Sequence, residues 1–159
     1  MIRTKLIASI TTALAISLFT ALPAHALNPA AAGAAEAVSL DPVSIGQAIA
    51  KSVHAVPNRE GFVKGLLYSA RHQTGGKYNV VVANLGNKHE ASGLRNVVYY
   101  QTFNYGDLVY GVWAFEDGVF DNQGDGGFIN WTFDGLWERQ DPNGQSNPRG
   151  MRVVFRKKP

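Results

Sequence analysis

Two stretches in the first half of the chain place apolar residues at the spacing of an amphipathic helix. The first begins at Asp41-Pro42 and ends before Pro57, and the second begins after Asn58 and ends before Gly75-Gly76. Asp and Asn are favoured N-caps, and Pro and Gly-Gly are typical helix boundaries. We therefore expect helices over 42–56 and 58–73. Their apolar positions are Ile45, Ala48, Ile49, Val53 and Val56, and then Phe62, Val63, Leu66, Leu67 and Ala70.

After Gly76 the apolar period changes from about 3.6 to two, which indicates strands. We expect a turn at Gly106-Asp107 and another at Glu116-Asp117-Gly118, because these residue types favour turns. The helices precede the strands instead of alternating with them. The pattern therefore predicts an α+β fold, with an antiparallel β-meander or sandwich of five to six strands after two helices. The expected strands are 78–83, 97–105, 108–115 with a continuation at 119–120, 128–137 and 151–156.

The N-terminal residues have the pattern of a secretory signal peptide. Arg3 and Lys5 precede an uncharged apolar stretch from Leu6 to Leu22, and Ala24-His25-Ala26 supplies a cleavage site. The apolar stretch is short for a membrane span, so we expect no transmembrane segment. The expected organisation is a signal peptide over 1–26, a flexible alanine-rich leader over 27–40 and a single α+β domain over 41–159. This organisation predicts a secreted, extracellular protein.

Composition excludes several classes of function. The 159 residues include no cysteine, which removes disulfides, thiol catalysis and cysteine-ligated zinc. The chain has 15 Lys and Arg against 12 Asp and Glu. Residues 1–26 hold two of the bases, so the cleaved chain would carry 13 − 12 = +1. We expect no nucleic-acid partner, because the basic cluster at the C-terminus is explained by a solvated strand edge. That cluster is Arg149, Arg152, Arg156, Lys157 and Lys158.

The stretch from Glu116 to Gly127 is rich in carboxylates and glycine. Asp121, Gln123 and Asp125 occupy the first, third and fifth positions of a calcium-binding loop, but the twelfth position is Thr132 instead of Glu. Asp121 and Asp125 are thus weak calcium ligands, and an ordinary hairpin turn explains the stretch more simply. We expect no cofactor.

Paired carboxylates also raise the alternative of a small secreted hydrolase. Glu116 with Glu138 or Asp121 is the pair to consider for glycosidase chemistry, although their spacing in the sequence does not fix their separation. No serine lies in a nucleophile-elbow context, and no phosphate loop is present. A non-enzymatic protein is the simpler interpretation.

Aromatic residues are concentrated between Tyr99 and Trp137, where 12 of the 17 lie. One face of a sheet cannot bury so many, so we expect some to emerge and form a glycan-binding surface with nearby polar groups. The hairpin from Tyr110 to Trp137 is the expected functional edge. The candidate ligand-binding residues are Tyr110, Trp113, Glu116, Asp117, Asp121, Asp125, Asn130, Trp131 and Trp137.

Four segments of the chain carry a resemblance to known proteins. They are 58–64 (NREGFVK), 77–80 (KYNV), 110–115 (YGVWAF) and 124–131 (GDGGFINW). They resemble a group of small secreted proteins, common in fungi and found in some bacteria, that are sometimes labelled stress proteins. The resemblance covers residues 58–158, except that 141–149 forms a longer final turn. It implies secretion and an intact fold, and it implies no catalytic residues.

These observations predict a secreted, non-enzymatic binding or interaction protein. Its partner would be an extracellular glycan, a membrane surface or another protein. An amphipathic N-terminal helix before an aromatic β-region is also similar in layout to actinoporin-like pore formers. A membrane-active protein is therefore an alternative, in which the first helix would insert into the bilayer.

Overall fold

Two helices form at the predicted places because each begins at a side-chain cap. Helix α1 (Pro42–Val53) starts after Asp41, whose carboxylate accepts from the amides of Val43 (3.2 Å) and Ser44 (3.1 Å). Helix α2 (Arg59–Gln73) starts after Asn58, whose side chain accepts from the Gly61 amide (2.7 Å). Each cap satisfies amides that the helix itself leaves unpaired. Helix α1 ends three residues earlier than expected.

The computed structural model describes residues 40–140 and 150–159, all within one compact unit that spans 37–159. The expected signal peptide, the leader up to residue 39 and the turn at 141–149 lie outside the described residues. Among the described residues, no helix is long and apolar enough to cross a bilayer.

Seven strands form one sheet in which every pairing is antiparallel, so the α+β prediction is confirmed. The sheet has one strand more than the upper limit we expected. It follows the order β5-β1-β4-β7-β6, with β2 and β3 paired to the other side of β4. The strands are β1 (Asn79–Asn84), β2 (His89–Glu90), β3 (Leu94–Tyr105), β4 (Leu108–Asn122), β5 (Trp131–Asp134), β6 (Trp137–Arg139) and β7 (Met151–Phe155).

The expected turn at Glu116-Asp117-Gly118 is wrong, because β4 runs straight through it. Gly118 has a φ of 128°, a conformation that favours glycine, and at this point the strand bends without ending. The half of β4 before the bend pairs with β1, and the half after it pairs with β7. A second bend, at Gly135-Leu136, separates β5 from β6.

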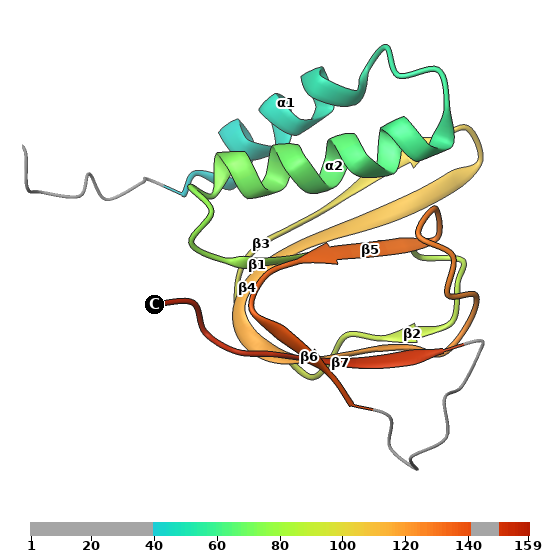
Figure 1. Cartoon of the computed structure of the whole chain (residues 1–159). Coiled ribbons are helices and arrows are strands. Elements are labelled where there is room, and N and C mark those ends of the chain that lie inside the picture. The colour runs from blue at the N-terminus through green and yellow to red at the C-terminus, as the bar shows by residue number, and fades with distance from the viewer. Residues whose placement is uncertain (1–39, 141–149) are drawn as a thin grey trace, which may run out of the picture. The chain divides into compact units, whose positions relative to one another are not determined.

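These two bends fold the sheet into two leaves that face each other (Figure 1). The upper leaf contains β5, β1, the first half of β4 and β3. The lower leaf contains β6, β7, the second half of β4 and β2. The arrangement is a sandwich made by bent strands, and it is not a meander.

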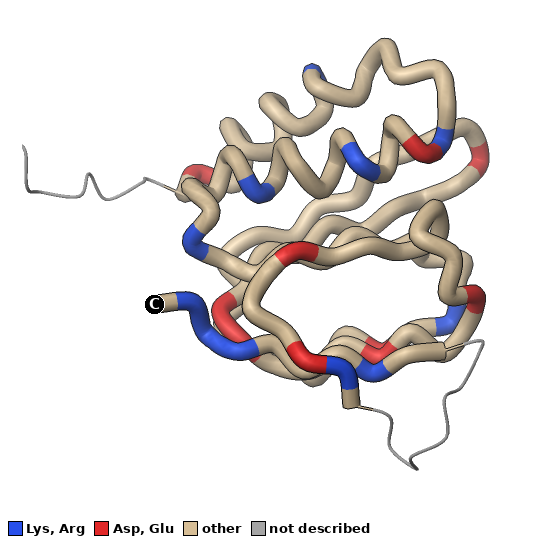
Figure 2. Tube along the Cα trace, viewed as in Figure 1, with Lys and Arg blue, Asp and Glu red and all other residues tan. Residues whose placement is uncertain are grey.

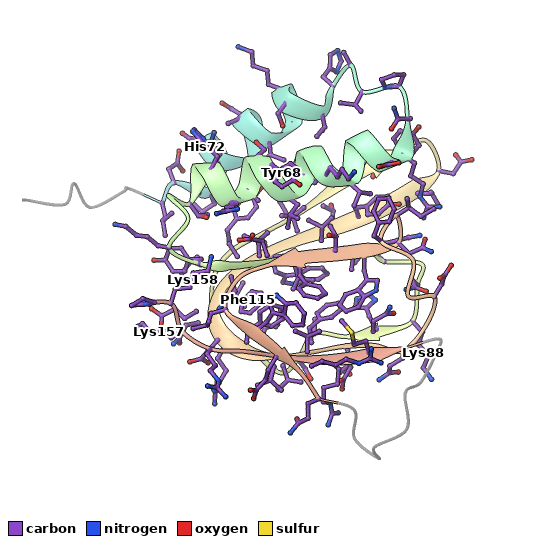
Figure 3. The ribbon with its side chains drawn as sticks, viewed as in Figure 1. Tyr68, His72, Lys88, Phe115, Lys157 and Lys158 are labelled. Atoms are coloured by element: carbon purple, nitrogen blue, oxygen red, sulfur yellow. The ribbon has the colours of Figure 1, made fainter. Side chains whose placement is uncertain are left out.

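Two separate cores result from this folding. The first lies between the helices and the outer face of the upper leaf, where Ile49, Leu66 and Val82 are buried. The second lies between the leaves, and Phe115, labelled in Figure 3, points into it. Strand β1 is buried on both faces because it belongs to both cores, which explains its continuous apolar sequence.

Asn79 is a fully buried polar residue at the junction of the leaves. Its Nδ2 donates to the main-chain oxygens of Glu116 (2.6 Å) and Arg156 (3.0 Å), and its Oδ1 accepts from the Leu136 amide (2.9 Å). One side chain therefore joins β4 to the segments that follow β5 and β7. It satisfies main-chain groups that the bends would otherwise leave unpaired.

Candidate functional site

The predicted acidic stretch is divided between a strand and a loop, and its strand carboxylates are held in ion pairs. Glu116 pairs with Lys157 (2.8 Å), and Asp117 with Arg95 (2.5 Å). Asp121 accepts two hydrogen bonds of 2.6 Å from Arg152. The two carboxylates of the calcium hypothesis therefore do not converge on one ion position, because Asp121 faces Arg152 while Asp125 bonds within its own loop. Across residues 40–140 and 150–159, no three His, Asp or Glu side chains gather as metal ligands.

The same pairing revises the interpretation of the C-terminal basic cluster. Two of its four described members, Arg156 and Lys157, are exposed to solvent as expected, but solvation is not their only environment. Each of the four lies against a carboxylate, and Figure 2 shows both signs of charge next to each other along this segment. The partners are Asp121 for Arg152, Glu138 for Arg156, Glu116 for Lys157 and Asp134 for Lys158. Arg149 lies outside the described residues. These ion pairs connect β7 and the residues after it to the rest of the sheet.

The carboxylates considered for hydrolase chemistry are unsuited to act as a general acid. Hydrogen bonds from Lys157, first, and from Asn96 lower the pKa of Glu116. A glycosidase acid needs a raised pKa so that it holds its proton at neutral pH. Glu138 is exposed and pairs with Arg156 at 2.7 Å. Glu116 therefore does not meet the requirement for the general acid of this alternative.

Most of the predicted aromatic site residues belong to the cores. Tyr110 is fully buried and Trp131 is 5% exposed, while Trp113 is half-buried beside His89 and Phe120. The other leaf covers most of the second face of the sheet, so these rings are largely buried there, although Tyr100 of β3 remains 50% exposed against Trp113 (5.0 Å between ring centroids). Trp137 is the exception, because it packs against Phe133 (5.0 Å between ring centroids) and remains 47% exposed.

Two loops are joined by asparagine side chains. One loop (85–88) follows β1, and the other (123–130) follows β4. The Asn87 side chain donates to Oδ1 of Asn122 (3.0 Å) and to the main-chain oxygen of Asp125 (3.1 Å), and its own Oδ1 accepts from the Asp125 amide (2.9 Å). Asn122 donates to the same Asp125 oxygen (3.0 Å). These bonds hold the second loop in a fixed position against the first.

Arg59 connects this loop pair to the start of α2. Its Nε donates to the Tyr110 hydroxyl (2.5 Å), and its guanidinium also donates to the side-chain oxygen of Asn130. The Tyr110 hydroxyl in turn donates to the main-chain oxygen of Ile129 (2.7 Å). The structure thus brings together Tyr110 and Asn130, two of the predicted site residues, through a residue that the sequence analysis missed.

Asp125 presents an exposed carboxylate that is oriented by its neighbours. The Gly127 amide donates to its Oδ1 (2.9 Å), and the Asn130 side chain donates to its Oδ2 (2.8 Å). Phe128, in the same loop, is 47% exposed, and the Lys64 Nζ lies 5.4 Å from its ring centroid. We call the exposed side of the loop pair, with Asn87, Asp125, Phe128, Asn130 and Arg59, the loop surface.

The loop surface combines groups that suit a hydroxyl-rich ligand. An exposed ring offers an apolar face, and a carboxylate with free lone pairs accepts hydrogen bonds from hydroxyl groups. Of the predicted residues, Asp125 and Asn130 lie here, and the buried Tyr110 lies beneath them, joined through Arg59. Glu116, Asp117, Asp121, Trp113, Trp131 and Trp137 lie on strands, with the contacts given above. Arg59 had a signal in the sequence, since a cation at the start of a helix is disfavoured by the helix dipole unless it has another role.

Comparison with known proteins shows a similarity to a bacterial protein. The chain is 45% identical over 102 residues to the stress response protein YvgO of Bacillus subtilis (strain 168). The match covers 64% of this chain and 63% of that protein, so it spans less than two thirds of the relative's length. No family model matches the chain, and no solved structure matches it. The resemblance to stress proteins that the sequence segments indicated is therefore supported by a similarity to a bacterial stress response protein.

Proposed function

We propose that this protein is a secreted, non-enzymatic glycan-binding protein of the stress response, and that it binds its ligand at the loop surface. The observation that carries the proposal is the exposed Asp125 carboxylate, held by Gly127 and Asn130 in the same loop as the exposed Phe128 ring. Secretion rests on the signal-peptide pattern of residues 1–26. The stress role rests on the name of the Bacillus relative.

The rigidity of the loop surface supports binding. A loop that is already fixed before binding loses little conformational entropy when a ligand arrives. Asn87, Asn122 and Arg59 fix the loops through their side chains, and Asp125 keeps acceptor lone pairs on both oxygens after its two hydrogen bonds. An aromatic ring beside such acceptors is the usual composition of a sugar site: the ring packs on the sugar face and the acceptors bind hydroxyls.

The membrane-active alternative requires α1 to leave its place. Ile45, Ile49 and Val53 of α1 are buried in the first core, so insertion of this helix into a bilayer would expose that core. Burial of three such side chains stabilises the folded chain by several kcal/mol, on the order of 1.5–3 kcal/mol each. The proposal therefore assigns α1 a structural role.

The experiment that tests the proposal is a glycan array with protein purified from culture medium, followed by titration of any glycan that binds. We expect Phe128→Ala and Asp125→Asn each to raise the Kd at least tenfold, because each removes a direct contact. Tyr100→Ala is the matched control, since Tyr100 is 50% exposed on β3, outside the loop surface, and its loss should change the Kd less than twofold.

Two results would contradict the proposal. The first is that no glycan binds the wild-type protein. The second is that binding persists at wild-type Kd in both loop variants. Release of vesicle contents by the wild-type protein, with no glycan bound, would favour the membrane-active alternative instead. N-terminal sequencing of the secreted protein should start at Leu27, and a protein that retains residues 1–26 would refute the expected cleavage.

A further inference from the structure

Two adjoining hollows lie at the C-terminal end of α2, and nothing in the proposed function so far uses them. One, of about 430 Å³, is lined by Gly75, Gly76, Lys77, Gly135, Leu136, Lys158 and Pro159. The other, of about 500 Å³, is lined by Tyr68, Arg71, His72, Gly75 and Gly76. They share the two glycines, and a Cβ at Gly76 would meet nothing within 4 Å, so the surface there is open. We call the two together the α2 hollow.

Positive charge predominates in the α2 hollow. Arg71, Lys77 and Lys158 line it, and the Asp134 carboxylate pairs with two of them, Arg71 and Lys158. Asp134 lies 3.2 Å from the Arg71 guanidinium and 3.5 Å from the Lys158 Nζ, so one carboxylate serves two cations. Lys158 is also fixed by a hydrogen bond to the Gly76 main-chain oxygen (3.2 Å). Lys77 is exposed and forms no ion pair among the described residues.

An exposed stripe of α2 links the hollow to the loop surface. Lys64, beside the Phe128 ring, is followed by Tyr68 and then by Arg71, at spacings of four and three residues that place them on one side of the helix. Tyr68 is 59% exposed, and Figure 3 shows it on α2 with His72 farther along the same helix. At 1.5 Å per residue, the helix extends about 14 Å from Lys64 to its last residue, Gln73.

We propose that the glycan bound at the loop surface is an acidic polysaccharide, which runs along α2 and places a negatively charged group in the α2 hollow. This inference rests on the proposed function. Aromatic rings alternate with cations along the stripe, which suits a chain of sugar rings. Lys64 pairs with Glu60 (2.6 Å) and Arg71 with Asp134 (3.2 Å), so the excess positive charge lies in the α2 hollow, where Lys77 and Lys158 join Arg71. A carboxylate, sulfate or phosphate on the sugar chain complements the charge of the hollow. An uncharged glycan could accept hydrogen bonds from these three cations, but it would form no ion pair with them. The proposal holds for carboxylates, sulfates and phosphates alike, because each places a fixed negative charge on the sugar chain.

The test compares polygalacturonate with the same polymer after full methyl esterification, so that only the charge differs. The protein is the secreted chain, and the measurement is the Kd by isothermal titration calorimetry. We expect polygalacturonate to bind at least tenfold more tightly than its ester. The double variant Arg71→Gln/Lys77→Gln should raise the Kd for polygalacturonate at least tenfold. Tyr68→Ala should raise the Kd for both polymers.

The matched control is Lys51→Gln/Arg95→Gln. It removes the same total charge from a lysine that forms no ion pair within residues 40–140 and 150–159, and from an arginine that, like Arg71, pairs with an aspartate. We expect this control to change the Kd less than twofold. An equal loss in the two double variants would mean that the affinity comes from net charge, and it would overturn the proposal.

The remaining outcomes separate this inference from the proposed function. One outcome is that both polymers bind with equal Kd and that Phe128→Ala weakens both. The α2 hollow then does not recognise negative charge, so this inference fails while glycan binding stands. If neither polymer nor any glycan on the array binds, both proposals fail. Binding of single-stranded oligo(dT) as tight as that of polygalacturonate, with the same sensitivity to Arg71→Gln/Lys77→Gln, would also overturn an assignment to acidic glycans.

Discussion

Asn79 should contribute more to stability than any other single polar side chain at the junction of the two leaves. In Asn79→Ala, the main-chain oxygens of Glu116 and Arg156 and the amide of Leu136 lose their partner. A buried polar group left without a hydrogen bond costs about 1–3 kcal/mol. Water can reach the carbonyl of Arg156, an exposed residue, which reduces the cost there. We therefore expect the free energy of unfolding to fall by about 3–5 kcal/mol.

The assay is urea unfolding followed by tryptophan fluorescence, because Trp113, Trp131 and Trp137 all lie in or beside the second core. Asn79→Asp is a second variant. It keeps an acceptor for the Leu136 amide but places an ionised carboxylate against two carbonyl oxygens, so it should be less stable than Asn79→Ala at pH 7. Its stability should recover partly at low pH, because a protonated carboxyl can donate one hydrogen bond.

The control is Asn104→Ala, a loss of the same side chain from an exposed position on β3, with an expected change within about 0.5 kcal/mol. A loss of less than about 1 kcal/mol in Asn79→Ala would refute the reasoning, because it would mean that the three main-chain groups find other partners.

Three further predictions concern ionisation and the bend in β4. Burial raises the pKa of Tyr99 to about 12, so an alkaline titration followed at 295 nm should show one tyrosine ionising near pH 12. The free energy of unfolding should fall between about pH 10 and 12, where only the unfolded chain releases this proton. The pKa of Glu116 is lowered by its hydrogen bond from Lys157, so the stability that this pair provides is fully present above about pH 4.5 and is lost as the pH falls through the lower folded-state pKa. The urea midpoints of wild type and Lys157→Gln should therefore converge in acid, and a constant gap would contradict this. Gly118→Ala should lower the free energy of unfolding in urea by at least about 2 kcal/mol, because a Cβ there would clash with the Gly93 main-chain oxygen and the φ of 128° favours glycine. A variant as stable as the wild type would show that the bend does not need glycine.

The elements that the sequence predicted well are those whose signals are local. Asp41 and Asn58 cap the helices through bonds to residues two or three positions away. The start of each helix is therefore determined by residues that are adjacent in the sequence. The alternation in β3 and β7 likewise depends on neighbouring residues. The prediction failed at Glu116-Asp117-Gly118, because a glycine with positive φ is compatible with both a turn and a bend in a continuous strand.

The candidate site was harder to predict because it depends on contacts between distant residues. The sequence identified the exposed acidic glycine loop that contains Asp125, and it identified Asn130. It could not show that Arg152, 31 residues away, occupies the carboxylate of Asp121. It also could not show that the lower leaf covers the face from which Trp113 and Trp131 were expected to emerge. Residue type places an aromatic in a strand, but only the folding of the sheet decides whether that strand has one buried face or two.

The loop surface is tested most directly by an NMR titration of the ¹⁵N-labelled secreted protein with a soluble oligosaccharide of the glycan that binds most tightly on the array. The account predicts that the amide signals of Asp125, Gly126, Gly127 and Phe128 shift in proportion to occupancy, while those of the β3 edge stay in place. Shifts confined to other surfaces, or no shifts at millimolar sugar, would contradict the claim that this loop binds the ligand.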